Sequence, residues 1–508
     1  MIWQELAKIA LLGTEHSAFS PQTLEALQAQ GIATDKEAPL VLAEAAALHA
    51  QLRKAGFPLE VFTGELPATV APSGEDACSQ KSSHHLRLIL GGRYGEVLPA
   101  FFHHLIKNKK CFPPEHLPAL LKRPDLHRWI GPLEQTLSEG GRWFLSQHPA
   151  WRHFIVKPTA DWHTGNREER LSLLGFLRRN DPAGGLSFLT ATWEQEHYSD
   201  KKAFLDLMQQ GLSIADEPFL EQCLDDGRKE VRSAAARLLA LLPESRLCQR
   251  MYRRATACLH RKGNSITMTI PDGIGPEDER DGILRTDKSW AGGAKAGYLG
   301  QVFSLVPPGK WEAFFKKTPA EIVKDFAKTD WSDTLLIALA KAAAMYGDQV
   351  WAGALLGHFF KKWDSPLWNN TDIRMLTKKI APAAVHALAM QALQERPGLP
   401  EEGSPVHILL LNSEAGWPND LTLLLVRRLQ EWLPKSRLQP WQMNPYILLM
   451  KTLALRCDPS LYDALQKGWP NTTPLWAFWE KSVEEMLDTV LFRREMIAAL
   501  ADEPAVGG

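Results

Sequence analysis

Short amphipathic segments separated by Pro or Gly make up most of this 508-residue chain, and this pattern limits its fold more than any other feature. Near the start, Ile2, Leu6 and Ile9 recur at the 3.6-residue spacing of one helix face, and Gly13 marks the end of the helix. Because short breaks between amphipathic helices place neighbours antiparallel, the sequence predicts an all-α protein of packed helix pairs.

The segment 224–239 carries the most specific pattern in the chain. Asp226 precedes the pair Val231-Arg232 by five residues, small residues follow, and the segment ends in Leu-Leu. This resembles the second helix of a HEAT repeat, with Gly227 where that motif usually has Pro. In such a repeat we expect Asp226 to cap the helix or the turn before it, Val231 to fill the core between repeats, and Arg232 to pair with acidic groups of a neighbouring repeat.

Two weaker copies of the Asp turn support a repeat architecture. Asp181-Pro182 lies 45 residues before Asp226, inside the period of roughly 40–47 residues of HEAT and armadillo repeats. Asp458-Pro459 supplies another copy later in the chain. We therefore predict a HEAT-like α-solenoid with degenerate repeats. A helical bundle with coincidental Asp-Pro turns is the alternative.

Two stretches interrupt the helical pattern and divide the chain. Residues 63–83, rich in Pro, Gly and Ser, predict an exposed linker after an N-terminal helical segment over 1–62. Residues 263–300 begin with alternating apolar side chains and continue with Gly, Asp and Glu, which predicts a small β-hairpin or loop insertion. This insertion separates HEAT-like repeats over 84–262 from C-terminal helical repeats over 301–508. It is either a structural spacer or, like many long loops, a functional element.

The sequence has none of the common catalytic and metal-binding motifs. The chain has no P-loop, dinucleotide fingerprint, nucleophile elbow or HExxH sequence. The histidine pairs His84-His85 and His103-His104 are consecutive, so on a helix they diverge by about 100° and do not form a zinc site. We therefore predict no catalytic residue, no cofactor and no metal, and a protein that is not an enzyme. A helical enzyme with a motif-free site is the alternative.

The sequence shows no targeting or membrane signal. Glu5 and Lys8 occupy the region where a signal peptide has its basic and apolar parts. The longest apolar run, residues 335–346, contains Lys341 and falls short of the roughly 18 residues of a membrane helix. The six cysteines lack CxxC spacing, which is typical of reduced thiols. These features predict a cytoplasmic protein with no membrane partner.

The net charge of −1 hides a strong local asymmetry. Residues 181–227 carry two basic and ten acidic side chains, whereas residues 228–262 carry ten basic and two acidic ones. Arg246, Arg250, Arg253 and Arg261 fall on one face of a helix predicted in the basic segment, which predicts an exposed stripe. The stripe is either a solvated face neutralised by the acidic segment, or a docking strip for an acidic partner or phosphates. The residues that we expect to contact a partner there are Arg228, Lys229, Arg246, Arg250, Arg253 and Arg261.

Several short motifs are spread along the chain, among them residues 10–14, 211–213, 241–247 and 307–311. Together they are similar to a bacterial family of large helical proteins of unknown function. Genes of that family tend to lie beside MoxR-type AAA+ ATPases and von Willebrand factor A proteins. The resemblance implies an accessory or scaffold role, with such an ATPase or von Willebrand factor A protein as partner, and it supplies no catalytic residue.

These observations favour a non-enzymatic protein-interaction scaffold. The alternative is a nucleic-acid-binding helical-repeat protein that uses the basic stripe over residues 228–262. That alternative predicts an affinity that falls steeply with salt, because phosphate contacts release counterions.

Overall fold

The chain divides into two compact units, Met1–Thr69 (unit 1) and Val70–Gly508 (unit 2). None of the described helices is both long and apolar enough to span a bilayer. Residues 63–77 of the predicted linker lie outside the described residues, as do residues 502–508, whereas residues 80–83 begin a helix. The computed structural model describes residues 2–55, 78–147, 151, 161–263, 265–396, 398–435, 442–472 and 476–501.

Unit 1 contains the helices α1 (Ile2–Leu12), α2 (Pro21–Ala29) and α3 (Ala38–Ala55). The Ser20 hydroxyl caps α2 by accepting a hydrogen bond from the Thr23 N–H. Glu5 of α1 accepts the Ser20 N–H at 2.6 Å, which ties the first two helices together. Hydrogen bonds from Thr23 and Ser20 lower the pKa of Glu5. The small core beneath them consists of Leu6, Leu27, Ile32, Val41 and Ala45, and Ile9 of α1 is also fully buried.

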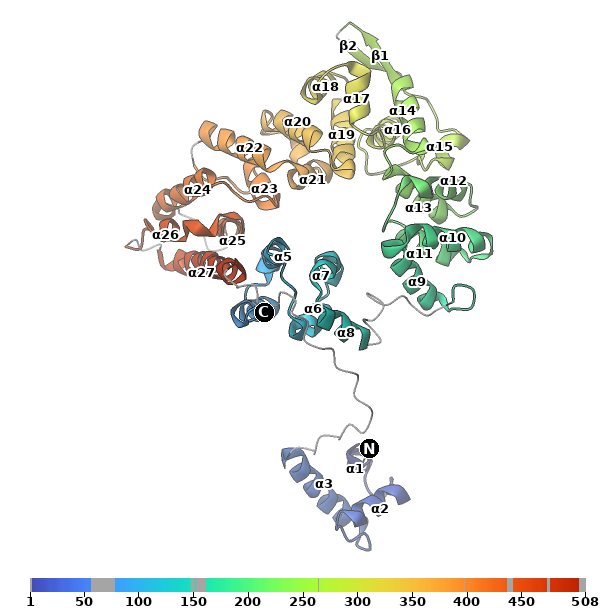
Figure 1. Ribbon diagram of the computed structural model, residues 1–508, viewed down its shortest axis with the longest axis vertical. Helices are drawn as coiled ribbons and strands as arrows, with labels where there is room; N and C mark the ends of the chain where they lie inside the picture. Colours follow the sequence, from blue (N-terminus) through green and yellow to red (C-terminus); the bar gives the residue numbers. More distant parts are fainter. Residues whose placement is uncertain are drawn as a thin grey trace, which may run out of the picture. The chain divides into compact units, whose positions relative to one another are not determined.

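Unit 2 is built from helices along almost its whole described length, together with one pair of strands (Figure 1). The helices before the strands are α4 (Gln80–Leu90), α5 (Leu98–Lys107), α6 (Leu117–Leu121), α7 (Ile130–Thr136), α8 (Glu139–Gln147), α9 (Arg167–Asn180), α10 (Pro182–Thr192), α11 (Tyr198–Leu207), α12 (Glu217–Cys223), α13 (Lys229–Ala240) and α14 (Arg246–Cys258). The helices after the strands are α15 (Pro276–Arg280), α16 (Gly293–Ser304), α17 (Gly309–Phe315), α18 (Pro319–Phe326), α19 (Ser332–Tyr346), α20 (Gln349–Phe360), α21 (Thr371–Lys379), α22 (Pro382–Glu395), α23 (Pro405–Asn412), α24 (Asn419–Trp432), α25 (Asn444–Arg456), α26 (Tyr462–Leu465) and α27 (Trp476–Ala501).

The predicted all-α class and the predicted hairpin are both confirmed. Strands β1 (Leu259–Lys262) and β2 (Ser265–Met268) pair antiparallel, with Leu259 opposite Met268 and Lys262 opposite Ser265. Burial alternates along β2, which reflects the period of two that its sequence shows, whereas three consecutive residues of β1, His260–Lys262, are exposed. The acidic stretch that follows, predicted as loop, forms the short helix α15 after a Gly275 cap and Pro276.

The helices of unit 2 pack in two layers, each helix contacting the next but one along the chain. One layer runs through α16, α19, α21, α23, α25 and α27, and the other through α18, α20, α22 and α24 (Figure 1). Each helix also contacts its antiparallel neighbour in the other layer, for example α20 against α19. This arrangement buries one apolar stripe per helix against two neighbours, as expected for helices with an apolar 3.6-residue repeat.

A buried arginine fixes the first helix pairs. The Arg178 side chain of α9 is inaccessible to solvent and forms an ion pair with Asp216 at 2.8 Å. Its remaining N–H groups donate to backbone carbonyls that follow α11, including those of Gln210 and Gly211, both at 2.9 Å. Because every polar group of this pair has a partner, burial of the charges is tolerated and α9, α11 and α12 are held in one arrangement.

The segment 224–239, whose sequence resembles a HEAT repeat, has largely the structure that its pattern predicts. Val231 is fully buried in the core of unit 2. Asp226 accepts the Arg228 N–H at 2.8 Å, so it caps the turn before α13, and it also pairs with Lys201 of α11 at 3.0 Å. Arg232 differs from the expectation, because it donates to the backbone carbonyls of Asp226 and Gly227 and not to an acidic group of a neighbour. Thus the link between neighbouring helix pairs here is Lys201–Asp226.

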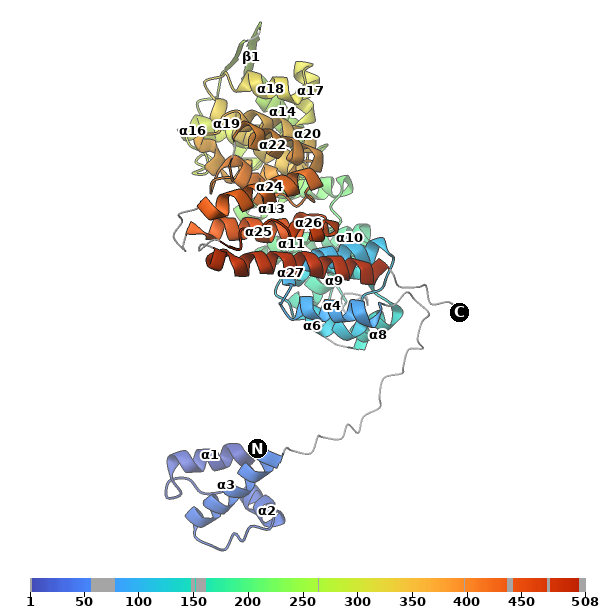
Figure 2. The same ribbon diagram turned by 90° about the vertical axis from the view of Figure 1, so that its left-hand side faces the viewer.

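Helix α27 connects two separate hydrophobic cores. Its first half, through Trp479 and Met486, belongs to the long core of α9–α25. Its second half, through Phe492 and Met496, completes the core of α4–α8. Figure 2 shows α27 beside α25 and in contact with α4. In the sequence, almost the whole of unit 2 lies between α4 and α27. The two ends of unit 2 in sequence are therefore joined by a single helix.

Gly300 tests how tightly α16 is packed. A Cβ atom at this position would lie 2.3 Å from the buried ring of Trp290. We expect Gly300→Ala to destabilise unit 2 by about 2 kcal/mol through overpacking, although Ala favours helix. The matched control is Gly353→Ala in α20, where the new Cβ meets no atom within 4 Å. Thermal unfolding followed by circular dichroism should give a lower Tm for the first variant and an equal or higher Tm for the control. Equal Tm values for the two variants would contradict this packing.

Candidate functional site

An open cleft of about 830 Å³ lies where α25 and α27 meet the segment α4–α7. We call it the junction cleft. It exists only because α27 brings together parts of the chain more than 300 residues apart. Its lining residues are Gly92, Arg93, Tyr94, Gly95, Glu96, Val97, Pro99, Arg123, Asp125, Arg128, Trp129, Lys451, Leu455, Glu485, Asp488 and Thr489.

The loop between α4 and α5 supplies one end of the junction cleft. Gly92 takes a φ of 91°, the left-handed conformation that Gly adopts at the end of a helix, and so terminates α4. Tyr94 then stacks on Phe492 of α27, with ring centroids 3.9 Å apart and ring planes 15° apart. This contact fixes the loop on α27 and leaves Arg93 and Glu96 exposed.

An ion pair organises the turn between α6 and α7. Arg123 donates to both carboxylate oxygens of Asp125, at 2.8 and 3.1 Å. These hydrogen bonds lower the pKa of Asp125 to about 2. Because the pKa is depressed in the folded state, the pair contributes fully to stability above the ordinary pKa of 3.8 and loses that contribution as the pH falls toward 2.

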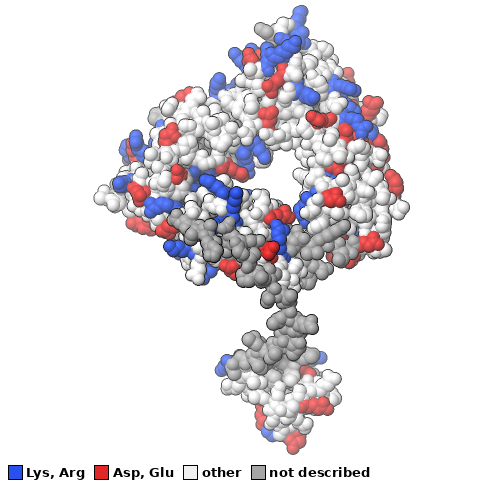
Figure 3. Space-filling view, viewed as in Figure 1, with Lys and Arg blue, Asp and Glu red and all other residues white. Residues whose placement is uncertain are grey.

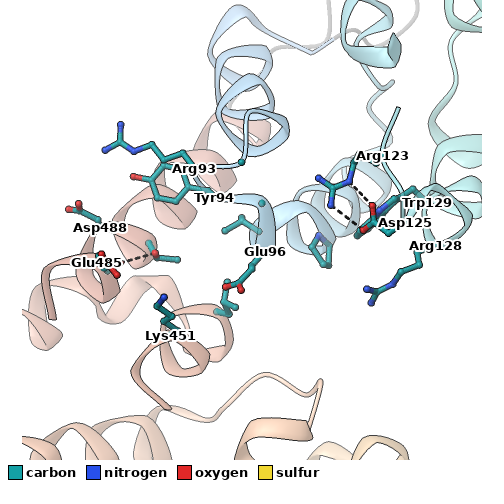
Figure 4. A pocket seen from close by; sticks show the side chains of 16 residues that line it. Arg93, Tyr94, Glu96, Arg123, Asp125, Arg128, Trp129, Lys451, Glu485 and Asp488 are labelled. Atoms are coloured by element: carbon teal, nitrogen blue, oxygen red, sulfur yellow. Dashed lines mark hydrogen bonds and ion pairs between the residues drawn. The ribbon is translucent and has the colours of Figure 1, made fainter. Parts of the chain in front are cut away.

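The other charged groups of the junction cleft carry both signs. Glu485 lies 4.0 Å from Lys481, whereas Glu96, Arg128, Lys451 and Asp488 form no ion pair within the part of the chain that the structure describes. Lys451 of α25 and Asp488 of α27 lie on one side of the cleft, Arg128 on the other and Glu96 between them (Figure 4). The Arg128 guanidinium lies 5.9 Å from the centroid of the buried Trp129 ring. These groups can form ion pairs with a polypeptide that carries both acidic and basic side chains.

Metal and thiol chemistry gain little support from the described part of the chain. Within it, no three His, Cys, Asp or Glu side chains converge as metal ligands. Burial raises the pKa of the Cys223 thiol to about 12 and that of Cys457 to about 11, which disfavours a nucleophilic thiolate at either position.

The predicted basic stripe is divided in the structure. The Arg228 guanidinium lies 4.9 Å from the ring centroid of Tyr198, and Lys229 is exposed at the start of α13. Arg246 approaches Glu217 at 3.5 Å with about half of its side chain (54%) exposed. Arg261 belongs to β1 and not to α14, because the helix ends at Cys258.

Arg250 of the predicted stripe lies in an internal ion network with Arg254. Arg250 pairs with Glu221 at 3.0 Å and with Asp281 at 2.7 Å. Arg254 pairs with Asp281 at 2.6 Å and with Asp278 at 2.8 Å. Asp281 is only 2% exposed, so two arginines of α14 hold the acidic part of the insertion against α12 and α14. Arg253, between them in sequence, stays exposed.

The junction cleft was not predicted from the sequence. Its residues come from three distant regions, and no periodic pattern tells which helices meet across the stack. The one signal in the sequence is the glycine-rich segment Leu90-Gly91-Gly92-Arg93-Tyr94-Gly95, which by itself predicts only a helix break. Arg93 and Tyr94 between glycines indicate a loop at the surface. Phe492, on whose ring Tyr94 stacks, lies almost 400 residues further along the chain.

The fold and the cleft define the class of this protein as a mostly helical protein with two packed layers and a polar cleft at its junction. A family model matches residues 5–500 of the chain. The chain therefore belongs to that family, which is described as a family of unknown function (DUF5691). No curated protein matches the chain.

The network around Asp281 gives a direct test of how the insertion is held. Arg250→Met with Arg254→Met leaves a buried carboxylate without its main partners and should cost about 3 kcal/mol. Adding Asp281→Asn removes the uncompensated charge and should restore part of the loss. Hydrogen exchange of residues 271–285 measures both effects. Unchanged protection in the double variant would mean that the network does not hold the insertion.

Proposed function

We propose that this chain is a non-enzymatic interaction scaffold that receives a segment of a protein partner in the junction cleft. The observation that carries the proposal is the set of exposed charges of both signs in that cleft, of which Lys451 and Asp488 lie on the packed helices α25 and α27. Groups held on rigid elements lose little conformational entropy on binding, so they can give specificity at small cost.

The partner that we propose is a MoxR-type AAA+ ATPase or the von Willebrand factor A protein encoded beside it. The family resemblance in residues 10–14, 211–213, 241–247 and 307–311 supports this choice. An ATPase that remodels other proteins needs accessory proteins that hold a substrate or a companion in place. A stack of helices with a polar cleft suits that task, because the site and the stack move as one body.

Nucleic-acid binding through residues 228–262 has less support. Two of the ten basic residues there, Arg250 and Arg254, pair with carboxylates inside the protein. Arg246 approaches Glu217, which reduces the free positive charge further. A phosphate-binding stripe needs cations that are free to release counterions.

Charge reversal in the junction cleft tests the proposed function. Lys451→Glu with Arg128→Glu should weaken binding to the purified neighbouring ATPase at least tenfold, because new like-charge contacts raise the dissociation rate. Biolayer interferometry with the immobilised full-length chain measures the change. Lys379→Glu, an exposed cation at the end of α21, is the matched control and should leave the affinity unchanged.

Two results would contradict the proposal. One is equal affinity of the ATPase for the cleft variant and the control. The other is the absence of binding to either the ATPase or the von Willebrand factor A protein while the chain retains nuclease-sensitive material absorbing at 260 nm. The second result would transfer support to the nucleic-acid alternative.

A further inference from the structure

The β-hairpin exposes one complete face. Side chains alternate along each strand, so His260, Lys262, Ser265 and Thr267 share one face, and all four are exposed. The opposite face carries Leu259, Ile266 and Met268, which pack against the long core, and Arg261, which lies opposite Ile266 with its side chain exposed. The hairpin is therefore anchored by its apolar face and displays its polar face.

Positive charge gathers on this hairpin. Figure 3 shows Lys and Arg side chains over the β1–β2 end of the molecule. Arg253 of α14 and the β1 residues Arg261 and Lys262 are exposed, and none of them pairs with a carboxylate in the part of the chain that the structure describes. We call Arg253, His260, Arg261 and Lys262 the hairpin patch.

The internal network separates the hairpin patch from the other arginines of α14. Arg250 and Arg254 are neutralised by Asp278, Asp281 and Glu221. The Arg261 side chain donates to the Gly263 carbonyl at 3.1 Å, which holds it at the hairpin turn. Arg261 and Lys262 therefore remain as cations without a carboxylate partner at the hairpin, and Arg253 as another on α14, within the described residues.

The outer edge of β1 also offers backbone hydrogen bonds. The Thr269 N–H donates to the Cys258 carbonyl at 2.9 Å, and the register continues in steps of two. In an antiparallel pair this places the N–H and C=O groups of Leu259 and Arg261 on the side away from β2. The Leu259 N–H donates to the Thr256 carbonyl at the end of α14, so the edge offers the Leu259 C=O and both backbone groups of Arg261. The sheet has two strands, so within the described residues no third strand covers this edge. An uncovered edge of this kind is a template for an added strand.

We propose that the hairpin patch docks an extended acidic segment of a protein partner, which adds a strand to the outer edge of β1. Backbone pairing with the Leu259 C=O and with the N–H and C=O of Arg261 would provide affinity, and carboxylates opposite His260 and Lys262 would provide selection for acidic sequences. A nucleic acid fits less well, because the patch offers three Lys and Arg side chains, fewer than the phosphate contacts of a protein that makes about 6–10 of them. This inference uses a different site from the junction cleft and does not depend on the proposed function.

A defined peptide tests the inference with the full-length chain. The probe is a labelled ten-residue peptide of alternating Glu and Thr, and its binding is measured by fluorescence anisotropy. Arg261→Glu with Lys262→Glu should weaken binding at least tenfold, and a peptide with Gln in place of Glu should bind at least tenfold more weakly. A peptide with two central prolines keeps the charge but cannot pair as a strand, and it should also lose binding. Lys379→Glu is again the matched control and should leave the peptide affinity unchanged.

Three outcomes would overturn the inference. In the first, the peptide does not bind, or binds the charge-reversed hairpin as well as the native one. In the second, the proline peptide binds equally well, so that charge alone acts. In the third, a 20-nucleotide single strand binds the hairpin patch in preference to the peptide, with a steep salt dependence, which would identify a nucleic-acid surface.

Discussion

Unit 2 depends on one constraint, the sharing of helix α27 between two cores. Trp479 and Met486 complete the long core, whereas Phe492 and Met496 complete the core of α4–α8. A single rigid helix of 26 residues thus fixes both ends of the stack relative to each other. Arg493 supports the link, because its buried guanidinium donates to the Ala454 and Cys457 carbonyls at 2.7 and 2.9 Å. The junction cleft follows from this connection, since its two sides belong to the two ends.

Arginine side chains recur in this protein as caps for the carbonyl ends of neighbouring helices. Arg178 does this after α11, Arg493 after α25, and Arg428 after α22, where it donates to the Arg396 and Gly398 carbonyls. A cation near the carbonyl end of a helix is favoured by the helix dipole, and Arg has enough donors to satisfy several carbonyls. An arginine that the sequence alone would place at the surface can therefore have a structural role. Arg250 of the predicted basic stripe is another example, because it pairs with Glu221 and Asp281 inside the protein.

The sequence predicted local features well and long-range ones poorly. The period of the apolar side chains and the Pro and Gly breaks predicted the helices and the hairpin, because these elements depend on side chains a few residues apart. The burial of Val231 and the capping of a turn by Asp226 also followed from a local pattern. The extension of α14 through Arg261 was wrong, since β1 begins at Leu259. The meeting of Tyr94 with Phe492 could not be predicted, because no periodic signal specifies which distant helices pack together.

Hydrogen exchange on a Met496→Asp variant tests the role of α27 most directly. A carboxylate at this fully buried position cannot be paired by the surrounding apolar side chains. We expect a large loss of protection in residues 80–147, whereas residues 319–360 should remain as protected as in the native chain. Unchanged protection in residues 80–147 would show that α4–α8 fold without α27, and it would remove the physical basis of the junction cleft.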